Sequence, residues 1–175
     1  MVGPRVQPEL FSILIQFRLF SVAICADVEK MFSQIKVHEE DVDWQRILWR
    51  DSPTEPIKEY RLTSVTYGTS SAPFLSTRIL KHPAIDEPEN YPAASRATLC
   101  HSYFDDLLNR SAIRKGTILL VFELQERMKR GGFSLRKWVS KDPDVLENIS
   151  EKLKAVDSKH AIEPVKILGI ALARC

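Results

Sequence analysis

FSVAICAD at 20–27 and LCHSYFDDLL at 99–108 are the two stretches that decide the expected fold. The first is an apolar, β-rich run that ends in Asp27, which is typical of a buried strand. The second has two short apolar arms that meet at Asp105 and Asp106, which predicts a tight hairpin with the acids at its tip. If these strands pair side by side, Asp27 and Asp105 become neighbours at one end of a sheet.

The segments nearest the first strand predict a helix before it and a second hairpin after it. Residues 10–26 are interpreted as a buried helix followed by the buried strand. Gln16 and Arg18 interrupt the apolar run, which is shorter than the roughly 20 residues of a membrane-spanning helix, and a signal peptide is the less favoured alternative. Residues 44–50 and 57–65 alternate polar and apolar side chains around DSPTEP, which predicts a β-hairpin with one solvated face.

The second half of the chain mixes helical and strand patterns. Ser70 or Ser71 is expected to cap a helix with Pro73 in its first turn, and the prolines of 82–97 predict an irregular connection. Residues 112–130 form the clearest helix, because apolar side chains recur at three- and four-residue steps. The remaining segments predict a helix stop at Gly131–Gly132, a strand at 133–139, an amphipathic helix at 143–156 and a final strand at 165–173. This mixture predicts an α+β fold with an antiparallel sheet packed against helices.

Length and composition place the chain among ordinary globular proteins. Its 175 residues and 20.0 kDa suit one domain or a piece of a larger one. With 44% hydrophobic and 27% charged residues, long disorder and fibrous classes are excluded. Cys25, Cys100 and Cys175 are too few and too scattered for a disulfide framework and fit a reducing compartment, and no Cys/His cluster has zinc-ligand spacing.

The net charge of +2 hides an uneven distribution. Residues 27–60 hold nine acids and five bases, a net charge of −4, whereas residues 110–141 hold nine bases and two acids, a net charge of +7. A basic flank beside an acidic one suits a site that holds metal and contacts phosphates. Two solvated faces of different charge explain the same numbers, and charge alone favours that simpler interpretation.

The candidate chemistry lies in three carboxylates. Close carboxylates repel one another, so Asp27 beside Asp105 and Asp106 would destabilise the edge of a core unless a cation were bound. Oxygen-only ligands favour magnesium or manganese over zinc, and two such ions can clamp both oxygens of a phosphoryl transfer. Taken alone, however, an Asp-Asp pair is most often a turn and a strand-end Asp is most often a cap.

Five motifs resemble the palm of a reverse transcriptase in their order and spacing. They are ADVEKMF at 26–32, YGTSSAP at 67–73, YFDD at 103–106, GGFSLRKW at 131–138 and KILGI at 166–170. The segments VGPRVQPELFSIL, QRILWRDSPTEPIKEYRL and YGTSSAPFLSTR are similar to the Bel/Pao group of long-terminal-repeat retrotransposons. The resemblance covers nearly the whole chain and implies that residues 1–175 are a single partial domain with a palm-like fold, most of the fingers and thumb lying elsewhere.

The resemblance implies a metal site in this chain. Asp27 and Asp105 would be the carboxylates that coordinate two Mg²⁺ or Mn²⁺ ions, and the backbone carbonyl of Val28 would complete one site. Asp106 would be the supporting acid. The family most often has Val where this chain has Phe104, an apolar replacement.

The resemblance also implies contacts with the nucleotide. Phe32 would lie under the incoming sugar and disfavour a 2′-hydroxyl, although a plain core aromatic is the alternative. Tyr67 and Gly68 would lie near the nucleotide and template. Lys137 would lie near the departing pyrophosphate, with a solvated strand lysine as an equally good alternative.

Primer contacts follow from the same resemblance. Tyr103 and Phe104 would lie near the primer end. Leu168 and Gly169 resemble the start of the motif that holds the primer. The implied activity is RNA-directed DNA polymerisation, in which the primer 3′-oxygen attacks the α-phosphate of a deoxynucleoside triphosphate.

The resemblance implies partners and a location as well. The partners are an RNA or DNA template with its primer, deoxynucleoside triphosphates, and the rest of a polyprotein with fingers, thumb and ribonuclease H regions. No membrane is expected, and the location is cytoplasmic. Two alternatives stay open: a catalytically silent remnant that at most binds nucleic acid, and a metal-dependent nuclease that uses the same acids.

Overall fold

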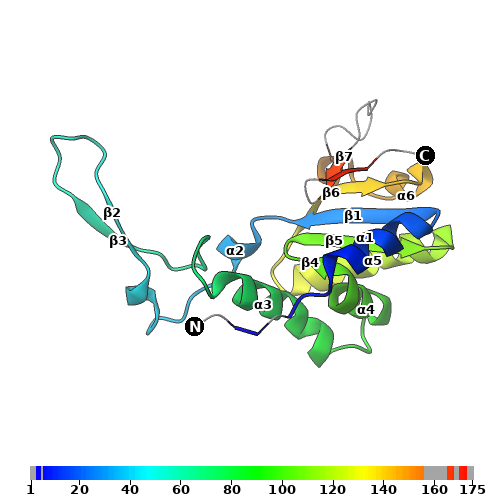
Figure 1. Cartoon of the computed structure of the whole chain (residues 1–175), viewed down its shortest axis with the longest axis horizontal. Coiled ribbons are helices and arrows are strands. Elements are labelled where there is room, and N and C mark those ends of the chain that lie inside the picture. Colours follow the sequence, from blue (N-terminus) through cyan, green and yellow to red (C-terminus); the bar gives the residue numbers. More distant parts are fainter. Residues whose placement is uncertain (1–2, 5, 156–164, 168–169, 173–175) are drawn as a thin grey trace.

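A four-stranded antiparallel sheet forms the centre of the chain (Figure 1). The structure, a computed structural model, describes residues 3–4, 6–155, 165–167 and 170–172. The strands are β1 (Val22–Val28), β4 (Ser102–Tyr103), β5 (Asp106–Ser111) and β6 (Leu135–Ser140), in the order β4-β5-β1-β6. The α+β fold with an antiparallel sheet against helices is thereby confirmed.

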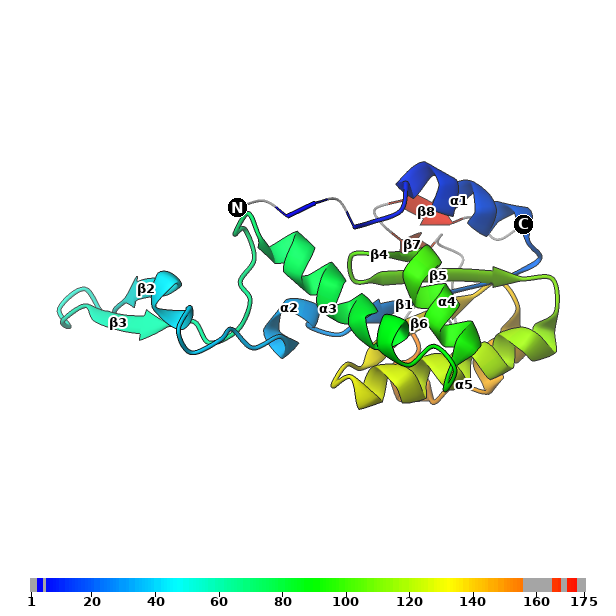
Figure 2. The same ribbon diagram turned by 90° about the horizontal axis from the view of Figure 1, so that it is seen from below.

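Strand β1 lies inside the sheet and is apolar on both sides because helices cover both faces (Figure 2). Ala23 and Cys25 pack with Ile13 and Phe17 of helix α1 (Leu10–Leu19). Ile24 points to the opposite face and joins the main core. The continuous apolar run in the sequence therefore reflects a strand buried on both faces.

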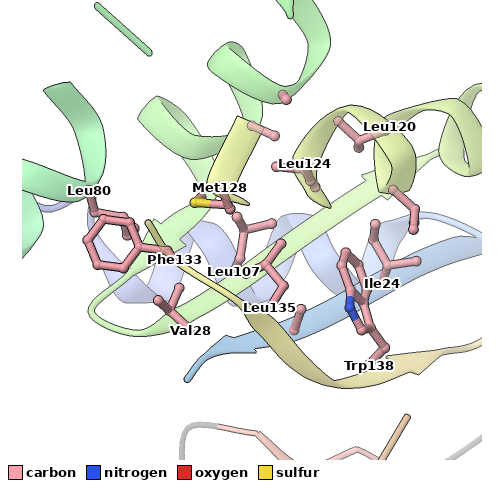
Figure 3. Close-up of a cluster of buried hydrophobic side chains, with 14 of the residues drawn as sticks. Ile24, Val28, Leu80, Leu107, Leu120, Leu124, Met128, Phe133, Leu135 and Trp138 are labelled. Carbon is pink, nitrogen blue, oxygen red and sulfur yellow. The ribbon is translucent and has the colours of Figure 1, made fainter. Parts of the chain in front are cut away.

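The main core lies between the sheet and helices α3 (Ala72–Asp86), α4 (Pro92–His101) and α5 (Arg114–Arg130) (Figure 3). Trp138 of β6 is fully buried beside Ile24. Leu124 and Met128 reach it from α5, at the helical spacing that the sequence shows. This core fixes the strands whose ends carry the candidate site.

Helix α5 confirms the clearest helical prediction. Thr117 and Val121 are buried, whereas Ile113 lies just before the helix and is exposed, so it does not belong to the buried face. Gly131 ends the helix and Gly132 adopts φ +79°, a conformation that glycine takes without a steric penalty.

The irregular connection predicted for 82–97 is wrong. Helix α3 runs through Pro83 to Asp86, and α4 begins at Pro92. Pro83 costs a backbone hydrogen bond, but burial of Leu80 and Ala84 on the same helix compensates. Proline at the first helical position loses nothing, because that N–H has no partner inside a helix.

Helix α1 is only half-buried, so the predicted buried helix is partly wrong. Phe11 and Leu19 are exposed, while Ile13 and Phe17 are buried. The segment is apolar on more than one side, yet the sheet covers one side only. No helix in the described part of the chain is long and apolar enough to cross a membrane.

The predicted hairpin forms from β2 (Arg46–Trp49) and β3 (Lys58–Arg61), and it projects away from the body (Figures 1 and 2). All strand residues are exposed, so the single solvated face that alternation suggests is wrong. Alternation shows which side chains share a face but not whether anything packs on it. Ion pairs such as Arg46–Glu59 hold the strands together.

The predicted helix at 143–156 breaks into a short α6 (Pro143–Glu147) and a 3₁₀ turn, η2 (Glu151–Leu153). Asp142 caps α6 by accepting a bond from the Asp144 N–H, and the backbone becomes extended at Ser150. The final segment is also not one strand, because β7 (Val165–Ile167) pairs antiparallel with β8 (Ile170–Leu172). The short elements α2 (Met31–Gln34) and η1 (Val42–Trp44) complete the described fold.

Candidate active site

The register of β1 and β5 brings the predicted acids together. Asp27 lies directly opposite Asp106, so their Cβ atoms are about 5 Å apart on one face of the sheet. The backbone N–H of Val28 donates to the carbonyl of Asp105 at 2.7 Å, which ties the hairpin tip to the end of β1. The sequence predicted Asp105 as the neighbour of Asp27, but the residue opposite Asp27 is Asp106, and Asp105 joins this end of the sheet through its backbone carbonyl.

A tight turn presents Asp105. Tyr103 pairs with Asp106, which leaves Phe104 and Asp105 as a two-residue connection. Phe104 has φ +52°, which costs a non-glycine residue about 1–2 kcal/mol. Its ring meets that of Tyr103 edge-on, with centroids 5.0 Å apart. The turn thus holds an uncommon backbone conformation beside the acids.

Lys137 supplies the positive charge at this end of the sheet. Its Nζ donates to Oδ2 of Asp27 at 2.8 Å. The pKa of Lys137 is raised, first by that hydrogen bond, then by the charge of Asp27, and further by Asp105 and Asp106. All three carboxylates therefore act on one ammonium group, which is 70% exposed and contributes little to stability. Lys137 is exposed, as expected for a solvated strand lysine, but its ammonium group forms an ion pair with Asp27.

Cys25 is a neighbour that sequence reasoning did not connect to the site. Burial is the first cause that raises the pKa of its thiol, and the charges of Asp106 and Asp27 raise it further. The signal was available in the sequence, because residues two apart in a strand point to the same face. The same end also holds an ion pair between Arg136 and Glu29 that sequence reasoning missed, with Nε and Oε2 2.6 Å apart.

Phe32 and Tyr67 form an aromatic pair, with ring centroids 4.9 Å apart and planes tilted by 55°. Phe32 is half-buried at the edge of the main core, and Tyr67 is 65% exposed. Gly68 has φ +82°, which favours glycine, and has open space around it. Leu168 and Gly169 lie outside the described residues.

The basic segment 110–141 does not form one phosphate-facing surface. Arg127 is 4% exposed and donates to Thr98 and to the carbonyl of Leu80. Burial lowers its pKa to about 10. Arg114 is paired with Asp142 and Asp144. Much of the charge counted in this segment is therefore structural.

The donor set suits a hard cation in its chemistry. Asp27, Asp105 and Asp106 offer oxygen atoms only, which are the ligands that Mg²⁺ and Mn²⁺ prefer. Within the described ranges, no three His, Cys, Asp or Glu side chains are arranged closely enough to hold a metal ion. The ammonium of Lys137 instead occupies one oxygen of Asp27. A bound divalent ion would therefore compete with Lys137 for that oxygen.

Comparison with known proteins gives no family assignment. No protein-family model matches the chain, and no curated protein matches it. Any assignment of function therefore depends on the motifs and on the geometry around Asp27.

Proposed function

We propose that the chain is the palm region of an RNA-directed DNA polymerase of the Bel/Pao retrotransposon type. The observation that carries the proposal is the pairing of Asp27 with Asp106, together with the hydrogen bond that joins Val28 to Asp105. Strand and hairpin sequences that are far apart in the chain meet at the acids. That meeting supports a shared cation site more strongly than the motifs alone do.

The reaction would transfer the nucleotide of a deoxynucleoside triphosphate to a primer 3′-hydroxyl on an RNA or DNA template and release pyrophosphate. Asp27, Asp105 and the carbonyl of Val28 would hold two Mg²⁺ or Mn²⁺ ions, with Asp106 as the supporting acid. When bound, these ions would activate the primer hydroxyl and neutralise charge on the triphosphate. The chain itself would position the reacting groups.

The surrounding side chains fit supporting roles in this reaction. The Phe32–Tyr67 pair offers an aromatic surface for the sugar and base of the nucleotide. Lys137, released from Asp27, would face the negative charge of the triphosphate. Tyr103 and Phe104 at the turn would contact the primer end, a role that the resemblance also gives to Leu168 and Gly169.

Exposed apolar side chains support a larger polyprotein as the partner. Leu48 and Trp49 on the projecting hairpin, Trp44 at the end of η1 just before it, and Phe11 and Leu19 on α1 are exposed. Apolar patches of this kind mark surfaces that other protein parts cover. Fingers, thumb and ribonuclease H regions would provide that cover, and the location would be cytoplasmic.

Primer extension tests this function. With a poly-A template, an oligo-dT primer and Mg²⁺ or Mn²⁺, we expect the chain to extend the primer. Asp105→Asn removes one charge at constant shape and should lower the rate by about 100-fold or more. Glu126→Gln makes the same change on an exposed part of α5 and should leave extension unchanged. Extension at equal rates in both variants would contradict the assigned site.

A catalytically silent remnant is the second candidate. The Lys137–Asp27 ion pair favours it, because a cation from the chain itself already compensates the acid. This candidate predicts salt-dependent binding to a primer–template without extension, because phosphate contacts release counterions.

A further inference from the structure

A second charged site lies at the other end of the sheet. An open cavity of about 400 Å³ forms between the end of β5, the first turn of α5 and one side of α4. Strand β4 pairs only with Asp106 and Leu107, so the later part of β5 is left open on that side among the described residues. The volume is within the range of small-ligand pockets. We call this space the α4–β5 cavity.

The lining of the α4–β5 cavity is basic. Arg96 of α4, His101 at the end of α4 and Arg110 of β5 line it, together with Asn109 and Ser111. None of the described lining residues is acidic, and no carboxylate within the described ranges forms an ion pair with Arg96 or Arg110. Unpaired guanidinium groups that converge on one cavity favour an anionic occupant.

Arg110 is held in place before any ligand binds. Its guanidinium carbon lies 5.2 Å from the centre of the Phe20 ring, a cation–π contact. The side chain is only half-exposed, and burial lowers its pKa. A pre-positioned guanidinium loses less conformational entropy when it binds an anion.

His101 adds a polar atom that lacks a partner. Its Nδ1 is buried and has no hydrogen-bond partner in the part of the chain that the structure describes, so the hydrogen bond of this ring with Asn109 uses the other nitrogen. Gly116 places the first turn of α5 at the same cavity, and that turn holds no acidic residue. The N-terminal end of a helix carries partial positive charge, which adds to the attraction for an anion.

A neighbouring cavity provides a contrast. It is lined by Arg114, Lys115 and Lys141, but Asp142 also lines it and pairs with Arg114. Its positive charge is therefore partly compensated from within the fold. The α4–β5 cavity lacks that compensation among its described lining residues.

We propose that the α4–β5 cavity binds a phosphoryl anion, either free or as the phosphate of a nucleic-acid strand. Arg96 and Arg110 would bind the anion, and the ring of His101 beside them would respond to its charge. Arg110 lies four residues beyond Asp106 on β5, about 13 Å along the strand, so this site is separate from the carboxylates. Phosphate binding at this site would not require polymerase activity.

Histidine proton NMR on the full chain tests the proposal at its own site. The chain has four histidines, and the His101→Gln variant identifies the His101 ring resonance by its loss. Inorganic phosphate, added at constant ionic strength, should shift the His101 resonance in a saturable way. The Arg96→Gln/Arg110→Gln variant should bind phosphate about tenfold more weakly for each arginine removed.

A charge-matched control tests whether phosphate is attracted only by the overall positive charge of the chain. Arg50→Gln/Arg78→Gln removes two exposed arginines outside the cavity and should bind phosphate as the unmodified chain does. If the double cavity variant fails to fold, Arg96→Gln alone is used, because Arg96 is exposed on α4. An unchanged His101 resonance, or equal weakening in the control, would overturn the proposal.

A second arm identifies the source of the phosphate. A single-stranded oligonucleotide should shift the His101 resonance and compete with phosphate if the site takes a strand. If only free phosphate shifts it, the site takes a small anion. Either result supports phosphoryl binding, whereas no shift with either probe contradicts it.

Discussion

The two ends of β5 carry opposite charge, and they differ in how far the fold compensates that charge. At one end, Asp106 faces Asp27, and Lys137 of β6 supplies a positive charge from within the fold. At the other end, Arg110 lies near Arg96 and His101, and no acid lines their cavity among the described residues. One strand of six residues therefore separates a partly compensated acidic cluster from an uncompensated basic one. The difference teaches that the fold supplies its own counter-charge at the acidic end and supplies no acid to the cavity at the basic end.

The first prediction concerns the core that both ends share. Trp138→Ala should lower the free energy of unfolding by about 3–5 kcal/mol, because it leaves a large cavity beside Ile24. Trp44, which is 85% exposed on the projecting part of the chain, provides the matched change, and Trp44→Ala should cost within about 0.5 kcal/mol. Urea unfolding measures both. Similar losses of unfolding free energy in the two variants would contradict the burial of Trp138 in the core that both ends share.

The second prediction acts at the acidic end only. Lys30 follows β1, is exposed and has φ +49°. Lys30→Gly should therefore stabilise the chain by about 0.4–1 kcal/mol, because glycine takes that conformation without strain. Lys36→Gly, at an exposed position without positive φ, should not stabilise. Equal effects in urea unfolding would show that the backbone at Lys30 is not strained.

The third prediction acts at the basic end and is the smallest. The pKa of His101 is lowered from its ordinary value of 6.5, first by burial and then by the charge of Arg110 and of Arg96, while a hydrogen bond with Asn109 opposes the shift. The unfolded chain therefore takes up a proton on this ring at a higher pH than the folded chain does. Stability should fall as the pH drops below about 6.5, and this loss is complete below the folded pKa.

The contribution of His101 to the pH dependence of stability is obtained by comparing the chain with a variant that lacks this histidine. Urea unfolding of the chain and of His101→Gln between pH 8 and pH 5 removes the contribution of other groups. The unmodified chain should lose more stability than the variant over this interval. Identical pH profiles would contradict the assigned environment of His101.

Local patterns predicted the elements that lie at the centre of the fold. Residues 20–27 predicted β1 because a strand covered on both faces is apolar throughout. Residues 112–130 predicted α5 because one helical face is buried. The acids at 105 and 106 predicted a hairpin tip, but the turn lies at Phe104 and Asp105, because Asp106 is the first residue of β5 and pairs with Tyr103. The predicted first arm is also mostly helical, because α4 extends to His101.

Other features depend on tertiary contacts that no local pattern contains. The helix through Pro83 persists because its neighbours are buried. The exposure of Leu48 depends on what packs against the hairpin. The contact of Lys137 with Asp27 depends on two features of β6. The register between β1 and β6 shifts between Cys25 and Asp27, and Lys137 has φ +53°. Neither feature can be predicted from the local sequence pattern.

Direct measurement of Mn²⁺ binding is the most stringent test of the central claim, that Asp27 and the hairpin acids share a divalent ion. Electron paramagnetic resonance of free Mn²⁺, titrated with the full chain, reports binding without any need for activity. We expect Asp27→Asn and Asp105→Asn each to weaken binding by at least about tenfold, and Glu126→Gln to leave it unchanged. Absence of Mn²⁺ binding, or equal binding in all the variants, would contradict the shared site.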